Sequence, residues 1–254
     1  MTVTTEDLFL GGALRLRQPA SGYRAGLDAV LLAAACPAEL GAAARVLDCG
    51  AGAGVVGLTV ARRVADVTVT LVEREPLLAA LAAGNAQANQ LASRCRVLTA
   101  DVTRPLAEVA GLAAETNSFD HVLANPPYHA HGVGTRSADA HKDGSHAMPA
   151  DALEDWVRFA AAMAREGGSL TMIHRTGAVP EMLAALARRF GALTLLPLHP
   201  RGGEAASRVL IQGRKGSRAG LRILSGRVLH ADSGHAFTPE FDGVLRGGAA
   251  LVWR

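Results

Sequence analysis

The sequence predicts an α/β fold with a mostly parallel sheet of seven strands, the last of them antiparallel. Three observations support this prediction. Apolar runs of strand length alternate with alanine- and leucine-rich stretches of helical length along most of the 254 residues. A glycine-rich turn at 50–57 directly follows the first expected strand, and a proline-rich turn at 125–128 directly follows the fourth. Both turns carry residues suited to binding a ligand at the end of a strand.

The chain before and around the glycine-rich turn contains two expected helices and one expected strand. Residues 26–40 have a helical pattern, with Asp28 near the start and Pro37 near the end. The apolar run 45–49 has the length and composition of a buried strand. It leads through the glycine-rich turn into an apolar stretch at 54–64, which we expect to be a helix.

The next three strands are recognised by the residues in which they end. The apolar run 67–73 ends in an acidic residue, and the run 95–99 leads to Asp101. Between them, the alanine- and leucine-rich stretch 76–91 is an expected helix. The fourth strand, 119–124, leads directly into the proline-rich turn.

The second half of the chain continues the alternation. Residues 129–148 are polar, with histidine, glycine and serine, and we expect a mobile lid or substrate loop there. Helix 150–165 follows, with apolar residues at the spacing of one buried face. The remaining elements are expected to be strand 169–174, helix 178–189, strand 192–198 and strand 207–213. The connection between the last two strands is too short for a crossover helix, so the last strand is expected to run antiparallel.

Length and composition predict one large domain with small additions. With 49% hydrophobic residues, the chain can bury a core of that size. We expect an N-terminal segment at 1–44, the main domain at 45–218, and a small β-rich appendix at 219–254 that packs on the same domain.

The sequence gives no indication of a membrane span, an export signal or a metal site. The N-terminus, with Glu6 and Asp7, lacks a basic start followed by an apolar core. The three cysteines are an odd number without metal-ligand spacing, so we expect reduced thiols in the cytoplasm. The pair His129 and His131 lies in a predicted loop without partners at ligand spacing, so no metal is expected. The oligomeric state stays open between monomer and homodimer.

The turn at 125–128 places hydrogen-bond acceptors beside an aromatic ring. Asn125 supplies a side-chain carbonyl oxygen, and Pro126 and Pro127 lack N–H groups and hold the turn rigid. Tyr128 adds a flat surface on which a planar substrate can stack. The Asn125 side-chain oxygen and an outward-pointing proline carbonyl are two fixed acceptors beside the ring. They suit a planar amino or amide nitrogen, as in adenine or a glutamine side chain.

The glycine-rich turn is suited to a nucleotide cofactor. Gly50, Gly52 and Gly54 allow a tight turn and a close approach of the backbone to a ligand at a helix N-terminus. Residues 52–57 also fit the dinucleotide fingerprint G-x-G-x-x-G, and Glu73, about 20 residues downstream, is placed to bind ribose hydroxyls. Taken alone, these features fit NAD and S-adenosylmethionine (SAM) equally well.

Two details favour SAM. Asp48 lies two residues before the first glycine of the turn, where its carboxylate can accept hydrogen bonds from the ammonium group of an amino-acid-bearing cofactor. The amine-accepting turn at 125–128 then follows the fourth expected strand. An NAD-dependent oxidoreductase would leave that second turn unexplained.

The order D-x-G-x-G-x-G at 48–54 and N-P-P-Y at 125–128 resembles the first and fourth motifs of class I SAM-dependent methyltransferases. The segment 22–32 and the segments around His199-Pro200-Arg201 and Arg208 extend the resemblance to the bacterial tRNA (valine) adenine-N6 methyltransferases, over residues 20–250. That resemblance implies a Rossmann-like fold and SAM as cofactor. It also implies a tRNA partner, methylated on the adenine just 3′ of the anticodon.

The resemblance and the residue chemistry together define the candidate site. The expected catalytic residues are Asn125, Pro126, Pro127 and Tyr128. The expected cofactor-binding residues are Asp28, Asp48, Gly50, Gly52, Gly54, Glu73, Asp101 and Asn125. In the family, Asp28 and its neighbours cover the methionine end of SAM. Asp101 either contacts the adenine amine of the cofactor or caps the end of its strand.

Basic residues are concentrated near the two ends of a chain whose net charge is +3. The two groups are Arg15, Arg17 and Arg24, and then Arg201, Arg208, Arg214, Lys215, Arg218 and Arg222. If both groups border the mouth of the site, they form a rim that binds phosphates. Arg24, Arg201 and Arg208 are the candidates for contact with RNA.

Other functions stay open on the sequence alone. A release-factor glutamine N5-methyltransferase would need the same acceptors for an amide nitrogen. That family usually carries a helical recognition domain before the SAM motif, and only residues 1–47 precede Asp48. An rRNA or DNA amino-methyltransferase would use the same motifs. A non-catalytic RNA-binding scaffold is the alternative from a different class, which the intact motifs disfavour.

Overall fold

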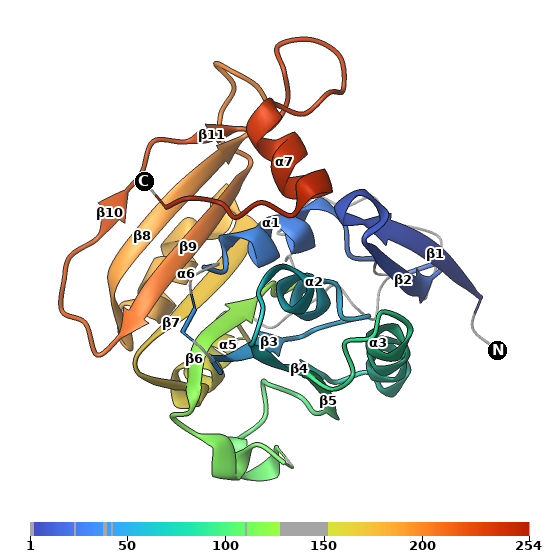
Figure 1. Ribbon diagram of the computed structural model, residues 1–254. Helices are drawn as coiled ribbons and strands as arrows, with labels where there is room; N and C mark the ends of the chain where they lie inside the picture. Colours follow the sequence, from blue (N-terminus) through green and yellow to red (C-terminus); the bar gives the residue numbers. More distant parts are fainter. Residues whose placement is uncertain are drawn as a thin grey trace.

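A central β-sheet with helices on both faces makes up most of the molecule (Figure 1). The computed structural model describes residues 3–22, 24–37, 40–41, 43–109, 111–127 and 152–253. The expected loop at 129–148 therefore lies outside the described residues, and so does Tyr128.

The main sheet contains the seven predicted strands in their predicted directions. Its strands are β3 Arg45–Cys49, β4 Thr68–Glu73, β5 Cys95–Thr99, β6 Phe119–Ala124, β7 Ala164–Arg175, β8 Phe190–His199, β9 Arg208–Lys215, β10 Arg222–Ile223 and β11 Arg227–Val228. Their order is β10-β8-β9-β7-β6-β3-β4-β5, and β11 also pairs with β8. The pairs from β5 to β7 are parallel, whereas β9 is antiparallel to both β7 and β8. This confirms the Rossmann-like arrangement with one antiparallel strand.

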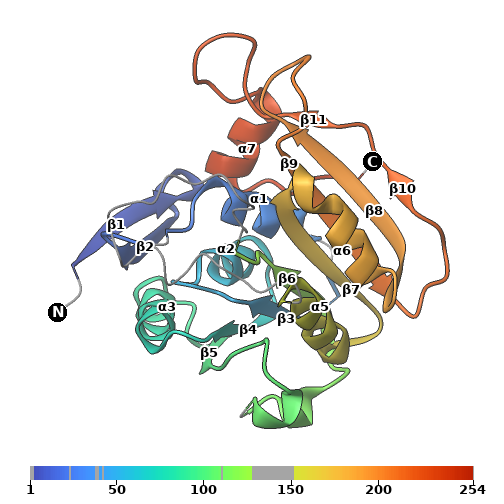
Figure 2. The ribbon, with the colours of Figure 1, turned by 180° about the vertical axis from the view of Figure 1, so that it is seen from behind.

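Helices bury both faces of this sheet. The helices are α1 Leu27–Ala35, α2 Val55–Arg63, α3 Pro76–Ala88, α5 Ala152–Met163, α6 Val179–Leu186 and α7 Pro239–Gly247. Short 3-10 turns lie at Leu10–Gly12, Leu106–Glu108, Ala113–Glu115 and Thr176–Ala178. One hydrophobic core includes residues of α1, α2 and α7, and the other includes residues of α5 and α6. The opposite views in Figures 1 and 2 show these two layers on either side of the sheet.

The N-terminal segment forms a β-hairpin that the sequence analysis did not anticipate. Strand β1 Thr4–Phe9 pairs antiparallel with β2 Leu14–Pro19. In β2, Leu14 and Leu16 are buried while Arg15 and Arg17 face solvent. One face of the hairpin therefore packs on the domain, beside α2 and α3.

The C-terminal segment is only partly β-structure. Strands β10 and β11 extend the edge of the sheet along β8, as the β-rich prediction suggested. The amphipathic helix α7 was not expected, and it packs on α1 (Figure 2). The tail beyond α7 is held along α1, because the Leu251 N–H donates to the Ala34 carbonyl and the Trp253 indole N–H donates to the Ala35 carbonyl.

All three cysteines are buried free thiols, at positions 36, 49 and 95. Burial raises the pKa of Cys36 to about 12 and that of Cys95 to about 11, so both stay protonated near neutral pH. Within the described ranges, every helix is too short or too polar to cross a membrane.

Candidate active site

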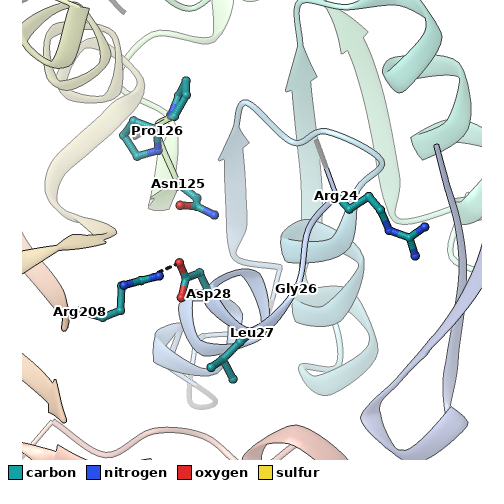
Figure 3. Close-up of a pocket in the computed structure, with 8 residues that line it drawn as sticks. Arg24, Gly26, Leu27, Asp28, Asn125, Pro126 and Arg208 are labelled. Carbon is teal, nitrogen blue, oxygen red and sulfur yellow. Dashed lines mark hydrogen bonds and ion pairs between the residues drawn. The ribbon is translucent and has the colours of Figure 1, made fainter. Parts of the chain in front are cut away.

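The candidate site is a cavity at the carboxyl edge of the parallel strands. Its volume is about 310 Å³, and its lining residues are Arg24, Gly26, Leu27, Asp28, Asn125, Pro126, Pro127 and Arg208. Three segments far apart in the sequence thus meet here: the start of α1, the turn after β6, and the start of β9. Figure 3 shows Asn125 and Pro126 on one side, facing Asp28 and Arg208 on the other.

The predicted catalytic turn is placed by the sheet. Strand β6 pairs with β3 so that Ala124 lies opposite Cys49, and Asn125 and Gly50 therefore begin neighbouring turns. Asn125 and Pro127 are half-buried, whereas Pro126 is buried. The structure brings these three predicted residues together in the cavity, while the fourth, Tyr128, is outside the described residues.

An ion pair closes the side of the cavity opposite Asn125. The Arg208 Nε lies 3.0 Å from the Asp28 Oδ2, and both side chains are half-buried. Arg208 reaches this edge because β9 is antiparallel and its first residue pairs with Arg175, the last residue of β7. Asp28 lies in the first turn of α1, where a carboxylate is also favoured by the helix dipole. The pair therefore ties the N-terminal segment to the sheet at the site.

The glycine-rich turn takes backbone conformations that only glycine adopts readily. Gly50, Gly52 and Gly54 have φ values of 68°, 58° and 92°. A Cβ on Gly50 would lie 2.3 Å from Cη2 of Trp156, the aromatic residue of α5 that packs under the turn. The turn therefore lies directly against Trp156 of α5, and there is no room for a side chain at Gly50.

Replacing Gly50 by alanine should destabilise the fold. The new methyl group must displace the Trp156 indole, and the alanine residue must keep a positive φ. Together these two effects should lower the free energy of unfolding by about 2–4 kcal/mol. Urea unfolding of the variant would measure this loss. Gly84→Ala is the matched control: Gly84 is exposed on α3 with no atom within 4 Å of a new Cβ, so alanine there should stabilise slightly. Equal stability of the two variants would contradict this account of the turn.

Asp48 is fully buried beneath the turn. Its Oδ2 accepts a hydrogen bond of 2.8 Å from the Gly57 N–H at the start of α2. The pKa of Asp48 is raised to about 7, mainly by burial; the Gly57 hydrogen bond lowers it, and the nearby charge of Glu73 adds to the increase. Asp48 does not line the 310 Å³ cavity. Contact between Asp48 and a cofactor ammonium stays a prediction.

Glu73 fixes the glycine-rich turn to the end of β4. Its Oε2 accepts a hydrogen bond from the Gly52 N–H (2.8 Å) and its Oε1 accepts one from the Glu75 N–H (2.9 Å). Each carboxylate oxygen has a second lone pair, so the side chain can still accept bonds from ribose hydroxyls. Binding of ribose by Glu73 therefore stays a prediction that is compatible with this geometry.

Asp101 caps the turn after β5. Its Oδ1 accepts hydrogen bonds from the Thr103 N–H (2.9 Å) and the Thr103 hydroxyl (2.7 Å). This is the capping role that the sequence left open beside a contact with the cofactor adenine. The second role stays a prediction.

The expected rim of basic residues is divided by the fold. The Arg24 guanidinium points away from Asn125 (Figure 3) and binds both carboxylate oxygens of Asp7, at 2.6 and 2.7 Å. Arg201 donates to the Gly234 carbonyl at 2.8 Å. Lys215, at the far end of β9 from Arg208, donates to the backbone carbonyls of Ala161 and Ala164. The condition that both basic groups border one mouth is therefore not met by the whole C-terminal group, because Arg208 and Lys215 lie at opposite ends of β9.

Residues 26–197 match the family model described as the methyltransferase small domain. The chain belongs to this family. This confirms the methyltransferase resemblance that the two motifs indicated.

Two solved structures resemble this chain over most of its length. A crystal structure of a predicted O-methyltransferase from Agrobacterium tumefaciens is 38% identical, with a TM-score of 0.73, and the match covers 89% of this chain and 98% of that one. The 16S rRNA N2 G1207 methyltransferase of T. thermophilus, in complex with AdoMet and guanosine, is 23% identical with a TM-score of 0.58. That match covers 84% of this chain and 50% of the other. The second likeness shows the fold alone.

A curated relative carries the activity that the sequence resemblance implied. It is the tRNA1(Val) (adenine(37)-N6)-methyltransferase of a Shewanella strain, which is 34% identical over 121 residues. The aligned residues cover 48% of this chain and 48% of the relative. The chain thus spans about half the length of that relative. The bacterial relatives of this chain therefore include proteins named for tRNA adenine-N6 methylation.

Sequence reasoning missed several residues of the site. Gly57 was part of the fingerprint but was not recognised as the partner of Asp48. Trp156 was expected only on a buried helix face, and its packing under Gly50 depends on the strand order. Asn85 of α3 donates to the Ala53 carbonyl inside the glycine-rich turn, and no sequence motif marked it. Among the described residues, no group of three or more acidic, histidine or cysteine side chains could hold a metal ion.

Proposed function

We propose that this protein is a SAM-dependent methyltransferase that methylates N6 of an adenine in a tRNA anticodon loop. The observation that carries the proposal is the position of Asn125 and Pro126 in one cavity, on the turn next to the glycine-rich turn. The reaction is placed in the cytoplasm, where tRNA substrates are found. In this proposal, residues 1–44 cover the cofactor site, 45–218 form the catalytic domain, and 219–254 pack on it.

The residues around the glycine-rich turn fit SAM. The turn is packed tightly against the protein, because a Cβ on Gly50 would lie 2.3 Å from Trp156 and a Cβ on Gly57 would lie 3.1 Å from the Asp48 Oδ2. Bare backbone at a helix N-terminus allows close approach by the polar part of a cofactor. Glu73 lies at the end of the neighbouring strand for the ribose, and Asp48 lies beneath the turn for the ammonium group. SAM, when bound, supplies a methyl carbon that is already activated by its sulfonium.

The catalytic turn supplies what an exocyclic amine lacks as a nucleophile. The lone pair of adenine N6 is delocalised into the ring. Asn125 Oδ1 and the Pro126 carbonyl would each accept one N–H of that amine, which favours a pyramidal nitrogen with its lone pair directed toward the methyl carbon. These hydrogen bonds strengthen as positive charge develops on nitrogen, so they stabilise the transition state more than the ground state. The methylated nitrogen becomes acidic and can lose its proton to water, so no strong general base is needed.

The substrate class follows from the number of acceptors. A hydroxyl group has one hydrogen and would leave one of the two oxygens without a partner, which argues against an O-methyltransferase. Guanine N2 and a glutamine amide each have two N–H groups, so the two acceptors fit them as well as adenine N6. The relatives named for tRNA adenine-N6 methylation favour adenine. Arg24, Arg201 and Arg208 stay the candidates for contact with RNA phosphates, and Arg208 is the one whose guanidinium faces the catalytic turn (Figure 3).

Labelled SAM tests the proposal directly. The purified protein is incubated with methyl-labelled SAM and with separate pools of tRNA, rRNA, DNA and protein, and the products are digested and analysed. We expect label in tRNA, as N6-methyladenosine. Label in N2-methylguanosine, on an oxygen atom or on protein glutamine would replace the proposed substrate with another. Absence of transfer to all four pools would overturn the activity itself.

A further inference from the structure

Two asparagines, Asn85 in α3 and Asn89 directly after its last residue, hold the N-terminal hairpin in the same way. The Asn85 Oδ1 accepts from the Arg17 N–H (2.8 Å) and its Nδ2 donates to the Arg17 carbonyl (3.0 Å). One helical turn later, the Asn89 Oδ1 accepts from the Arg15 N–H (3.0 Å) and its Nδ2 donates to the Arg15 carbonyl (2.7 Å). Strand β2 is thereby fixed to α3, beside which it lies in both views (Figures 1 and 2).

Only Asn85 also reaches the glycine-rich turn. Its Nδ2 donates a second hydrogen bond to the Ala53 carbonyl, at 2.9 Å. The second bond that the Asn89 Nδ2 donates goes instead to the Asn85 carbonyl in the last turn of α3, at 2.8 Å. The Asn85 side chain is only 2% exposed, and the three hydrogen bonds described above satisfy its polar atoms without water. The two side chains thus differ in one respect: Asn85 joins the hairpin to the glycine-rich turn, and Asn89 does not.

The hairpin in turn holds the wall of the cavity. Gln18, the residue after Arg17, accepts from the Ala25 N–H (2.9 Å) and donates to the Ala25 carbonyl (3.1 Å). Gln18 is also 2% exposed. Ala25 directly precedes Gly26, and that residue and the next two line the cavity. A series of hydrogen bonds therefore runs from the glycine-rich turn, through Asn85 and β2, to the cavity wall opposite Asn125; it is buried at the turn and part-buried beyond it.

We propose that Asn85 is a positioning residue for methyl transfer, which keeps the glycine-rich turn and the cavity wall at 24–28 in one fixed relation. This inference rests on the proposed function, because it assumes that SAM binds at the turn and the substrate amine at the cavity. Loss of the Asn85 amide leaves the Ala53 carbonyl without this donor in a buried place, and the turn must move to satisfy it. The hairpin loses its tie to that turn at the same time, so cofactor affinity falls.

Asn85→Ala and Asn89→Ala separate this role from a structural one. Each variant loses the same pair of hydrogen bonds to β2 and one further bond, to the Ala53 carbonyl or to the Asn85 carbonyl, so we expect similar decreases in melting temperature. Only Asn85→Ala should weaken the binding of S-adenosylhomocysteine, by roughly tenfold, the equivalent of about 1.4 kcal/mol. Its KM for SAM should rise by a similar factor, with a smaller change in the KM for RNA. Titration calorimetry and steady-state kinetics measure both.

The outcomes are distinct. Equal affinities of the two variants for S-adenosylhomocysteine, within twofold, would overturn the role of Asn85. A wild-type protein that binds no S-adenosylhomocysteine and transfers no methyl group would contradict the proposed function instead. If Asn85→Ala does not fold, Asn85→Ser and Asn89→Ser replace the pair, because a serine hydroxyl is too short to bridge β2 and the Ala53 carbonyl. The same difference in affinity is then expected.

Discussion

Replacing Asn125 by alanine is expected to abolish methyl transfer while the protein still binds SAM. The variant loses the side-chain oxygen that accepts an N–H of the substrate amine, and only the Pro126 carbonyl is left. Removal of one such fixed hydrogen-bonding group from a reaction centre typically lowers kcat by about 10²–10³-fold. A methyl-transfer assay measures this loss, and isothermal titration with S-adenosylhomocysteine shows whether the cofactor site is intact.

Asn125→Asp is the control for this prediction. Aspartate keeps an acceptor oxygen at the same position, so part of the activity should return relative to alanine. Melting temperatures of both variants show whether the fold is preserved. Full activity in Asn125→Ala would refute the role assigned to this side chain, and loss of SAM binding would show that Asn125 serves the cofactor rather than the amine.

Replacing Asp48 by asparagine is expected to stabilise the protein at pH 8 and to weaken cofactor binding. Burial raises the pKa of Asp48 to about 7, so at pH 8 the folded state carries a buried negative charge. Asparagine has no charge, and its Oδ1 can still accept the Gly57 N–H. The gain in unfolding free energy at pH 8 should reach at most the order of 4 kcal/mol. The ammonium group of SAM would lose its counter-charge, so affinity should decrease.

The contribution of Asp48 to the unfolding free energy changes with pH in a way that can be tested. Because the folded-state pKa of Asp48 is raised, its contribution to stability is fully present below its unfolded value near 3.8 and is lost as pH rises to about 7. His121 acts in the opposite direction, since burial lowers its pKa to about 4, and its contribution is lost as pH falls below 6.5. The two effects partly cancel between pH 4 and 6.5 in the wild type.

Asp48→Asn should remove that cancellation. The unfolding free energy of the variant is expected to rise with pH from about 4 to 6.5, more steeply than in the wild type, because the contribution of His121 is then no longer opposed by that of Asp48. Urea unfolding from pH 4.5 to pH 8 measures both curves. A variant that is less stable than the wild type at pH 8, or that binds S-adenosylhomocysteine as tightly, would contradict the role of Asp48.

The sequence predicted the sheet well because its strands are buried and bounded by turns. Strands 45–49, 95–99 and 119–124 were placed at their observed ends, since apolar runs there stop at glycine, acidic or proline-rich segments. The hairpin 4–19 was missed because its β2 strand alternates leucine with arginine over only six residues. Helix α7 was missed because it is short and polar on one side, so its stability depends on packing against α1.

The site could be predicted only where its residues are close in the sequence. The glycine-rich turn and the Asn125 turn are local motifs, and the fold places them side by side as the strand order requires. Asp28 and Arg208 are 180 residues apart, and their ion pair depends on the direction of β9. Arg24 was expected near RNA, but its pairing with Asp7 arises from a hairpin that the sequence did not reveal. Long-range contacts of this kind have no local signal.

A structure of the protein with S-adenosylhomocysteine and an anticodon-loop RNA would test the central claim most directly. We predict that the target adenine N6 lies within about 3.2 Å of both the Asn125 Oδ1 and the Pro126 carbonyl oxygen, with the cofactor sulfur on the opposite side of the nitrogen from these oxygens. An N6 atom more than about 4 Å from both oxygens would contradict the account.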